Sequence, residues 1–170
     1  MNHYFAHIKQ VLERDVASYL AAFFRWLLLS ALIGLLGGFI GTAFYQAIVY
    51  VTGVRQAHPE LIYLLPFAGL LIVFSYRVAR LRKDPGTNIV IESIVDANHS
   101  VPIRMAFLIF GGTVVTHLFG GSVGRESAAL QIGGCVGSGV GKLLKLDERS
   151  QKLITMCGLS ALFSAVFGTP

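Results

Sequence analysis

Residues 26–52 contain no formally charged side chain, and this apolar stretch limits what the chain can fold into more than any other feature. A helix that crosses a bilayer needs about 20 mainly apolar residues, so the stretch predicts a transmembrane helix long enough to tilt. Across the whole chain, 54% of the residues are hydrophobic and 14% are charged. Soluble domains carry about 25% charged residues, so the composition predicts an integral membrane protein.

The segments on either side of this stretch predict an orientation in the membrane. Residues 1–24 are amphipathic and predict an interfacial helix, whereas residues 61–76 predict a second span with a kink at Pro66. Four cations follow that span within residues 77–83, but the loop at residues 53–60 carries a single cation, Arg55. Because positive loops stay inside, we expect a multi-pass membrane protein with a cytoplasmic N-terminus and the loop near residue 56 outside. We expect this membrane to be the plasma (inner) membrane.

The second half of the chain consists of shorter, glycine-interrupted segments. We expect a half-length apolar segment at residues 88–96, a fuller helix at 103–118 and a glycine-rich break at 119–127. A helix over 128–144, a charged turn over 145–152 and a last apolar segment over 153–167 follow. Small residues four apart let helices approach closely. Such spacing occurs at Gly34 with Gly38, at Gly37 with Gly41, and along Gly133, Gly137 and Gly141.

Two irregular breaks, at residues 85–88 and 120–127, each precede a predicted helix. Irregular backbone at membrane depth is tolerated only where protein buries it or where it lines a wet cavity. The start of a helix offers unpaired N–H groups and the positive end of a dipole, which together favour anions. Two such breaks in one membrane chain predict an anion pathway.

Glu126 lies in the second break and has two interpretations. A carboxylate at a helix N-terminus can simply complement the dipole, as on many soluble helices. Within a membrane, an ionisable side chain usually marks an ion or proton route. A carboxylate that occupies the anion's place would block the path while ionised, move away when protonated, and so carry a proton. For the neighbouring Arg125 we favour a structural counter-charge over direct anion contact.

The residues around Glu126 resemble a known family. Residues 121–133, GSVGRESAALQIG, resemble the GxxxGREGPxxxxG signature of the CLC family of chloride channels and anion/proton antiporters. Residues 163–170, FSAVFGTP, are similar to the family's later AAxFxxP stretch, and residues 85–90, PGTNIV, lie where the family has GSGIP. The resemblance implies that Glu126 is the gating and proton-coupling glutamate. It implies anion-binding positions at Gly124, Arg125, Ser127, Ala128, Gly86, Thr87 and Asn88.

Departures from the family pattern bear on the choice of ion. Ser127 and Ala128 replace Gly-Pro after the glutamate, and Asn88 and Val90 replace residues of GSGIP. Together with residues 101–106 and 112–122, they resemble the fluoride-exporting branch of the family. The resemblance therefore implies fluoride export coupled to protons, while the hydroxyl at Thr87 keeps chloride as an alternative.

The resemblance also implies a fold. CLC proteins consist of two inverted repeats and form homodimers, and this chain corresponds to the first repeat, with short, broken helices. We therefore expect an all-α membrane protein in which residues 1–24 form the interfacial helix. Residues 25–170 would form a transmembrane region truncated before the second repeat, and we expect these 170 residues alone not to conduct.

Several other classes of function are disfavoured by the sequence. The cations lie between apolar runs and are not interleaved with aromatic residues, so no nucleic-acid partner is predicted. No Cys, His or Asp cluster has metal-ligand spacing, so we predict no metal. With the resemblance to a transporter family, we predict neither a cofactor nor an enzyme. Cys135 and Cys157 suit packed helices, and His117 suits a hydrogen-bonded packing role. The rival interpretations are a non-transporting membrane scaffold and a short transporter that pairs two copies in opposite orientations.

Overall fold

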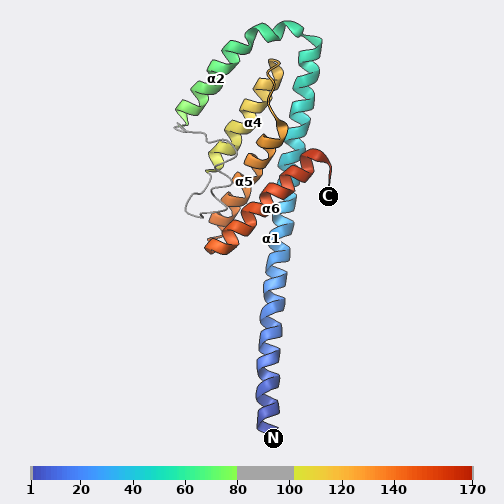
Figure 1. Cartoon of the computed structure of the whole chain (residues 1–170), viewed down its shortest axis with the longest axis vertical. Helices are drawn as coiled ribbons and strands as arrows, with labels where there is room; N and C mark the ends of the chain where they lie inside the picture. The colour runs from blue at the N-terminus through green and yellow to red at the C-terminus, as the bar shows by residue number, and fades with distance from the viewer. Residues whose placement is uncertain (1, 80–101, 170) are drawn as a thin grey trace. The chain divides into compact units, whose positions relative to one another are not determined.

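The computed structural model describes residues 2–79 and 102–169, and this part of the chain is helical without a β-strand. The expected all-α class is therefore confirmed for the described residues (Figure 1). The elements are α1 (Asn2–Ala57), the 3-10 helix η1 (Pro59–Leu64), α2 (Leu65–Val78), α4 (Ile103–Leu118), α5 (Arg125–Leu143) and α6 (Glu148–Phe167).

Three stretches of helix are long and apolar enough to cross a membrane: Val16–Ala57, Pro59–Val78 and Glu148–Phe167. Helix α4 is a shorter apolar helix. The chain is therefore a multi-pass membrane protein. Helix α1 continues without a break from Asn2 to Ala57, so the surface position of residues 1–24 stays a prediction. Residues 1–32 and 33–170 form two compact units, and the packing described below is that of the second.

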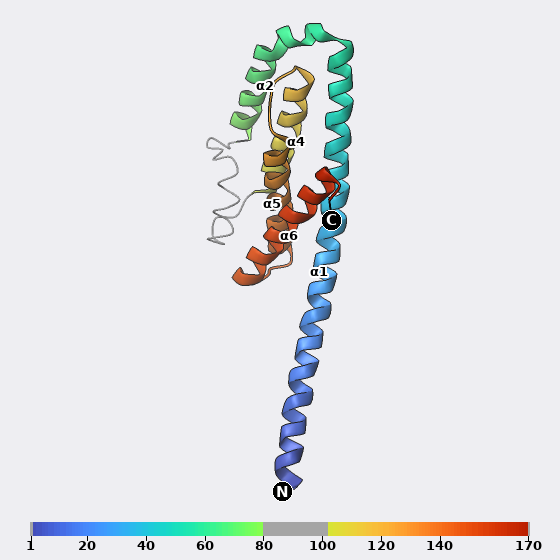
Figure 2. The ribbon, with the colours of Figure 1, turned by 45° about the vertical axis from the view of Figure 1, so that its right-hand side comes forward.

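Helices α5 and α6 lie side by side because glycines remove the side chains between them (Figures 1 and 2). A Cβ on Gly137 would lie 2.8 Å from the Cα of Thr155, and a Cβ on Gly141 would lie 2.8 Å from the Gln151 carboxamide carbon. The stripe of glycines predicted in α5 is thus confirmed as a helix contact. Next to it, Gln151 is buried, and its Nε2 donates a hydrogen bond to the Ser138 carbonyl at 2.9 Å.

Only one of the two glycine pairs in α1 makes such a contact. A Cβ on Gly37 would lie 2.7 Å from the Ala161 Cβ, and one on Gly41 would lie 2.7 Å from the Ala165 Cβ, both in α6. Nothing lies within 4 Å of the corresponding positions on Gly34 and Gly38. Gly37 and Gly41 therefore pack α1 against α6, whereas Gly34 and Gly38 face open space.

The core of the second unit lies where α1, α4, α5 and α6 meet. Phe44 is fully buried, and its ring centroid lies 5.2 Å from that of Phe110 in α4. This apolar cluster holds one side of α5 in place, including its first turn. Its buried members are Phe44, Ile48, Met105, Ala106, Ile109, Ala128, Ala129, Ile132, Cys135, Val136, Leu162 and Val166.

One predicted kink and one predicted boundary were wrong. Pro66 lies in the first turn of α2, directly after η1, so it starts this helix instead of kinking it. Its missing N–H breaks no helical hydrogen bond there. The charged turn also ends earlier than predicted, because α6 already begins at Glu148. Asp147 caps it by accepting a hydrogen bond from the Ser150 N–H at 3.2 Å, and Lys152 pairs with Glu148 at 3.0 Å.

Candidate functional site

The break between α4 and α5 begins with a tight turn. The Phe119 N–H donates to the Val115 carbonyl at 3.1 Å, and the Gly121 N–H donates to the Thr116 carbonyl at 2.8 Å. Between them, Gly120 has a φ of +82°, in the left-handed region that suits glycine. Helix α4 therefore ends at Leu118, and the chain runs without regular structure until α5 starts at Arg125.

The end of α1 holds this turn in place. A Cβ on Gly120 would lie 2.8 Å from the Nε of Arg55, so the guanidinium lies directly against the glycine. Arg55 belongs to the last turn of α1. A Cβ on Gly121 would in turn lie 3.3 Å from the Cδ1 of Leu65, at the start of α2. The two glycines therefore let the loop pass close to both ends of the α1–α2 connection.

Helix α5 starts without a side-chain cap. Its N-cap is Gly124, with φ −71° and ψ 124°, and this glycine provides no side-chain cap hydrogen bond. The N–H groups of the first turn thus keep the positive end of the helix dipole available to a ligand or to a carboxylate. Glu126 lies in this first turn and is exposed. Its Oε2 lies 3.9 Å from where a Cβ on Gly124 would be, so the carboxylate turns back toward the cap.

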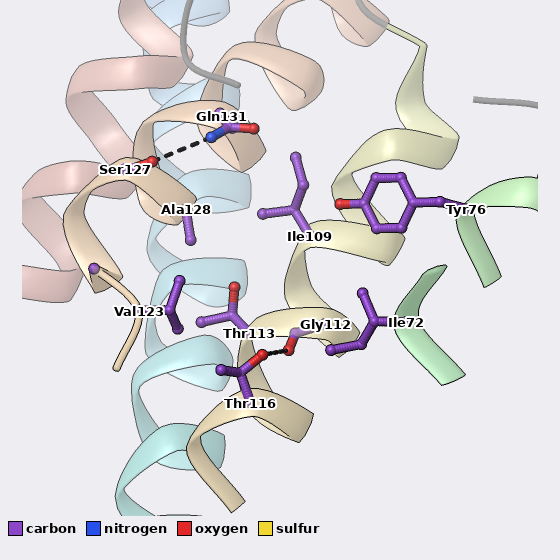
Figure 3. Close-up of a pocket in the computed structure, with 11 residues that line it drawn as sticks. Ile72, Tyr76, Ile109, Gly112, Thr113, Thr116, Val123, Ser127, Ala128 and Gln131 are labelled. Carbon is purple, nitrogen blue, oxygen red and sulfur yellow. Dashed lines mark hydrogen bonds between the residues drawn. The ribbon is translucent and has the colours of Figure 1, made fainter. Parts of the chain in front are cut away.

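The structure brings some of the predicted site residues together and separates others. Gly124, Ser127 and Ala128 line one pocket of about 180 Å³ between α2, α4 and the start of α5 (Figure 3). Arg125 and Glu126 are exposed and do not belong to this lining. The predicted positions Gly86, Thr87 and Asn88, and with them Val90, lie outside the described residues.

The pocket combines apolar walls with polar groups. Ile72 and Tyr76 come from α2, and Ile109 comes from α4. Hydroxyl groups enter the lining at Tyr76, Thr113, Thr116 and Ser127 (Figure 3). Thr116 donates its hydroxyl hydrogen to the Gly112 carbonyl at 2.7 Å. This mixture of apolar walls and a few polar groups is typical of sites for small ligands.

Gln131 is a pocket residue that the sequence interpretation did not single out. It lies one turn beyond Ser127, only 7% exposed, and its Nε2 donates to the Ser127 Oγ at 3.2 Å. Its Oε1 is buried, and no donor in the part of the chain that the structure describes bonds to it. A lone glutamine in an apolar helix carries no motif, so only the three-dimensional arrangement reveals this acceptor.

The smaller predictions concern His117 and the two cysteines. His117 is half-buried and donates from its Nδ1 to the Thr113 carbonyl at 2.8 Å, which confirms a hydrogen-bonded histidine. Cys135 is buried and Cys157 half-buried, and neither forms a disulfide. Among the described residues, no group of three His, Cys, Asp or Glu side chains could hold a metal ion.

Comparisons with known proteins place these features in context. The family model described as voltage gated chloride channel matches residues 68–170. A chloride/fluoride channel protein from Pseudomonas syringae pv. tomato is 39% identical over 93% of this chain, which corresponds to 34% of that protein. The H(+)/Cl(-) exchange transporter ClcA from Cronobacter sakazakii is 31% identical over 97% of this chain and 37% of its own length.

A solved structure also resembles this one. The crystal structure of a CLC-type fluoride/proton antiporter matches with a TM-score of 0.78 and 33% identity, over 84% of this chain and 36% of that one. The chain thus spans about a third of the length of the relatives that it matches.

Proposed function

Because this chain belongs to the voltage-gated chloride channel (CLC) family, we propose that it forms the first inverted repeat of a fluoride exporter in which Glu126 gates the anion path. Membership makes it part of a transport family and not of an enzyme family. In the full-length protein we expect a homodimer in the plasma (inner) membrane, with the N-terminus in the cytoplasm. Chloride transport is the alternative.

The observation that carries this proposal is the position of Glu126. It is an exposed carboxylate in the first turn of α5, which follows an irregular glycine loop and a glycine cap. An anion and a carboxylate favour the same place at the positive end of a helix. Glu126 would therefore compete with the transported anion while ionised and release the path when protonated. The backbone N–H groups of Gly124, Arg125, Ser127 and Ala128 would face the anion, and Gly86, Thr87 and Asn88 are the further anion-binding positions that we propose.

Fluoride is favoured over chloride by the relatives. The Pseudomonas protein is named for chloride and fluoride, and the matching crystal structure is that of a fluoride/proton antiporter. The Cronobacter relative is named for proton/chloride exchange and is less identical. The gating glutamate serves either ion, so the choice of ion is separate from the role of Glu126.

Efflux from liposomes tests the proposal. The protein in its full natural length is reconstituted, and fluoride efflux, chloride efflux and proton uptake are recorded together. We expect fluoride efflux to exceed chloride efflux, and Glu126→Gln to abolish proton uptake while changing the anion rate. Glu148→Gln is the matched control, since Glu148 is also an exposed carboxylate in the first turn of a helix.

Two results would contradict the proposal. If Glu126→Gln leaves both the anion rate and the proton rate as they are in the native protein, the gating role is wrong. That result would favour a scaffold that packs through its glycines. Chloride efflux faster than fluoride efflux would keep the gate and assign the other ion.

A further inference from the structure

The turn between α5 and α6 contains a lysine in a backbone conformation that normally selects glycine. Lys145 has a φ of +50°, and among the residues that the structure describes it is the one residue other than glycine with a positive φ. The Lys145 N–H donates to the Lys142 carbonyl at 3.0 Å, and the Leu146 N–H donates to the Gly141 carbonyl at 3.0 Å. These two bonds form the Schellman motif that ends many helices, and glycine is the usual residue at its left-handed position. Because such strain is typical of functional positions, it points to a use for the lysine ammonium group.

The cations around this turn outnumber the carboxylates that could neutralise them. Residues 142–152 contain four cations, Lys142, Lys145, Arg149 and Lys152, and two carboxylates, Asp147 and Glu148. Both carboxylates are engaged in α6, one as the helix cap and one in an ion pair with Lys152. Lys145 and Arg149 are exposed, and no acidic side chain in the described part of the chain forms an ion pair with either. Two positive charges therefore remain for an anionic partner.

The position of the turn puts these charges at the edge of the membrane. Helix α5 runs from the glycine break, whose Gly120 lies against Arg55 at the end of α1, to Leu143 at the opposite end of the second unit (Figures 1 and 2). Helix α6, which is long and apolar enough to cross a membrane, starts there at Glu148. A turn at the start of a membrane span lies near the level of the lipid headgroups. In the orientation proposed above, these headgroups belong to the cytoplasmic leaflet.

Exposed leucines stand next to the cations. Leu143 is 81% exposed and Leu144 is 45% exposed, and both directly precede Lys145. Apolar side chains beside cations are typical of segments in a membrane interface, where the apolar groups reach the acyl chains and the cations reach the phosphates. A soluble anion would satisfy the cations and leave the leucines in water. The combination therefore selects a partner with an anionic head and apolar tails.

We propose that Lys145 and Arg149 bind the phosphate of an anionic glycerophospholipid. The acyl chains of this lipid contact Leu143 and Leu144, while the ammonium and guanidinium groups donate to the phosphate oxygens. The contact compensates for the left-handed backbone at Lys145, so the lipid stabilises the end of α5 together with the start of α6. The site is separate from the first turn of α5, and the proposal does not depend on the role of Glu126.

Thermal unfolding in lipid nanodiscs tests the site. The protein in its full natural length is placed in phosphatidylcholine alone or in phosphatidylcholine mixed with phosphatidylglycerol, and we expect the anionic lipid to raise the unfolding midpoint. Lys145→Gly separates the two effects of the lysine, because glycine suits the left-handed backbone but carries no charge. It should raise the midpoint in phosphatidylcholine and lose at least half of the shift that phosphatidylglycerol gives the native protein. Arg149→Gln should lose the shift to a similar extent without the gain in phosphatidylcholine.

Arg77→Gln is the matched control for a general response to charge. It also removes an exposed cation, but from the last turn of α2 and not from the α5–α6 turn. We expect this variant to keep the full shift. The proposal would be overturned by the absence of any shift in the native protein, or by an equal shift in the native protein, Lys145→Gly and Arg149→Gln. A loss in Arg77→Gln as large as in Lys145→Gly would also overturn it.

Soluble glycerol phosphate distinguishes a lipid from a free phosphate. Added to the native protein in phosphatidylcholine nanodiscs, it should leave the midpoint unchanged, because it has no acyl chains to contact the leucines. A shift as large as that with phosphatidylglycerol would assign the cations to a soluble phosphate and overturn the lipid site. Leu143→Ser keeps both cations and removes an apolar contact, so it should reduce the shift with phosphatidylglycerol. An unchanged shift in this variant would contradict the contact with acyl chains.

Discussion

Gly133 of α5 and Gly158 of α6 face each other so closely that a Cβ on either one would overlap the carbonyl oxygen of the other. The contact is reciprocal and involves backbone on both sides, so no flexible side chain can move out of the way. It fixes the distance between the two helices, and through α5 it fixes the position of the turn that carries Glu126.

Substitution at this contact is therefore expected to destabilise the protein. Gly133→Ala and Gly158→Ala should each lower the free energy of unfolding by about 2 kcal/mol, because an overpacked contact between backbones forces the helices apart. The unfolding midpoint in detergent measures the effect. Gly38→Ala is the control, since nothing lies within 4 Å of a Cβ there. Equal midpoints for Gly133→Ala and Gly38→Ala would contradict the close packing.

The turn after α4 gives a second prediction, which concerns Gly120. Gly120→Ala should cost about 1–2 kcal/mol of stability from the left-handed backbone alone. The Arg55 Nε adds a steric cost, because it lies 2.8 Å from the new Cβ position. In the background of Arg55→Ala, the substitution should therefore cost less. Chemical unfolding of the two single variants and the double variant measures this coupling, and additive effects would show that the guanidinium does not restrict the turn.

The start of α6 gives a third prediction. Asp147→Ala should lower stability by about 1 kcal/mol, because the Ser150 N–H loses its acceptor. Asp147→Asn keeps a side-chain oxygen and should change the unfolding midpoint much less. A loss of the same size in both variants would mean that the charge, and not the cap, supports this helix.

Much of this fold could be predicted from the sequence because membrane helices are marked by long apolar runs. Helix α4 has the predicted bounds, Ile103–Leu118. Helices α5 and α6 start three and five residues earlier than predicted, at Arg125 and Glu148. Their first turns are polar and carry no apolar signal, so a hydropathy pattern cannot find them.

The site was less accessible to sequence reasoning. Glu126 stands out because a charge in an apolar region is costly. Gln131 does not, since its importance comes from an acceptor without a donor, which is a property of its surroundings. Likewise, glycine spacing marks Gly34 with Gly38 as strongly as Gly37 with Gly41, and only the position of α6 decides which pair packs.

A fourth prediction concerns residues 1–170 by themselves. A helix-terminus donor contributes about 1 kcal/mol to holding an anion, so several donors must converge to form a site in the membrane. The described residues supply one such start beside the glycine loop, that of α5, and the chain spans 34–37% of the length of its relatives. Liposomes that contain only this polypeptide should therefore release fluoride and chloride no faster than protein-free liposomes, whereas the protein in its full natural length should release fluoride. Anion release by the 170-residue polypeptide that Glu126→Gln changes would show that one repeat is enough to build the path.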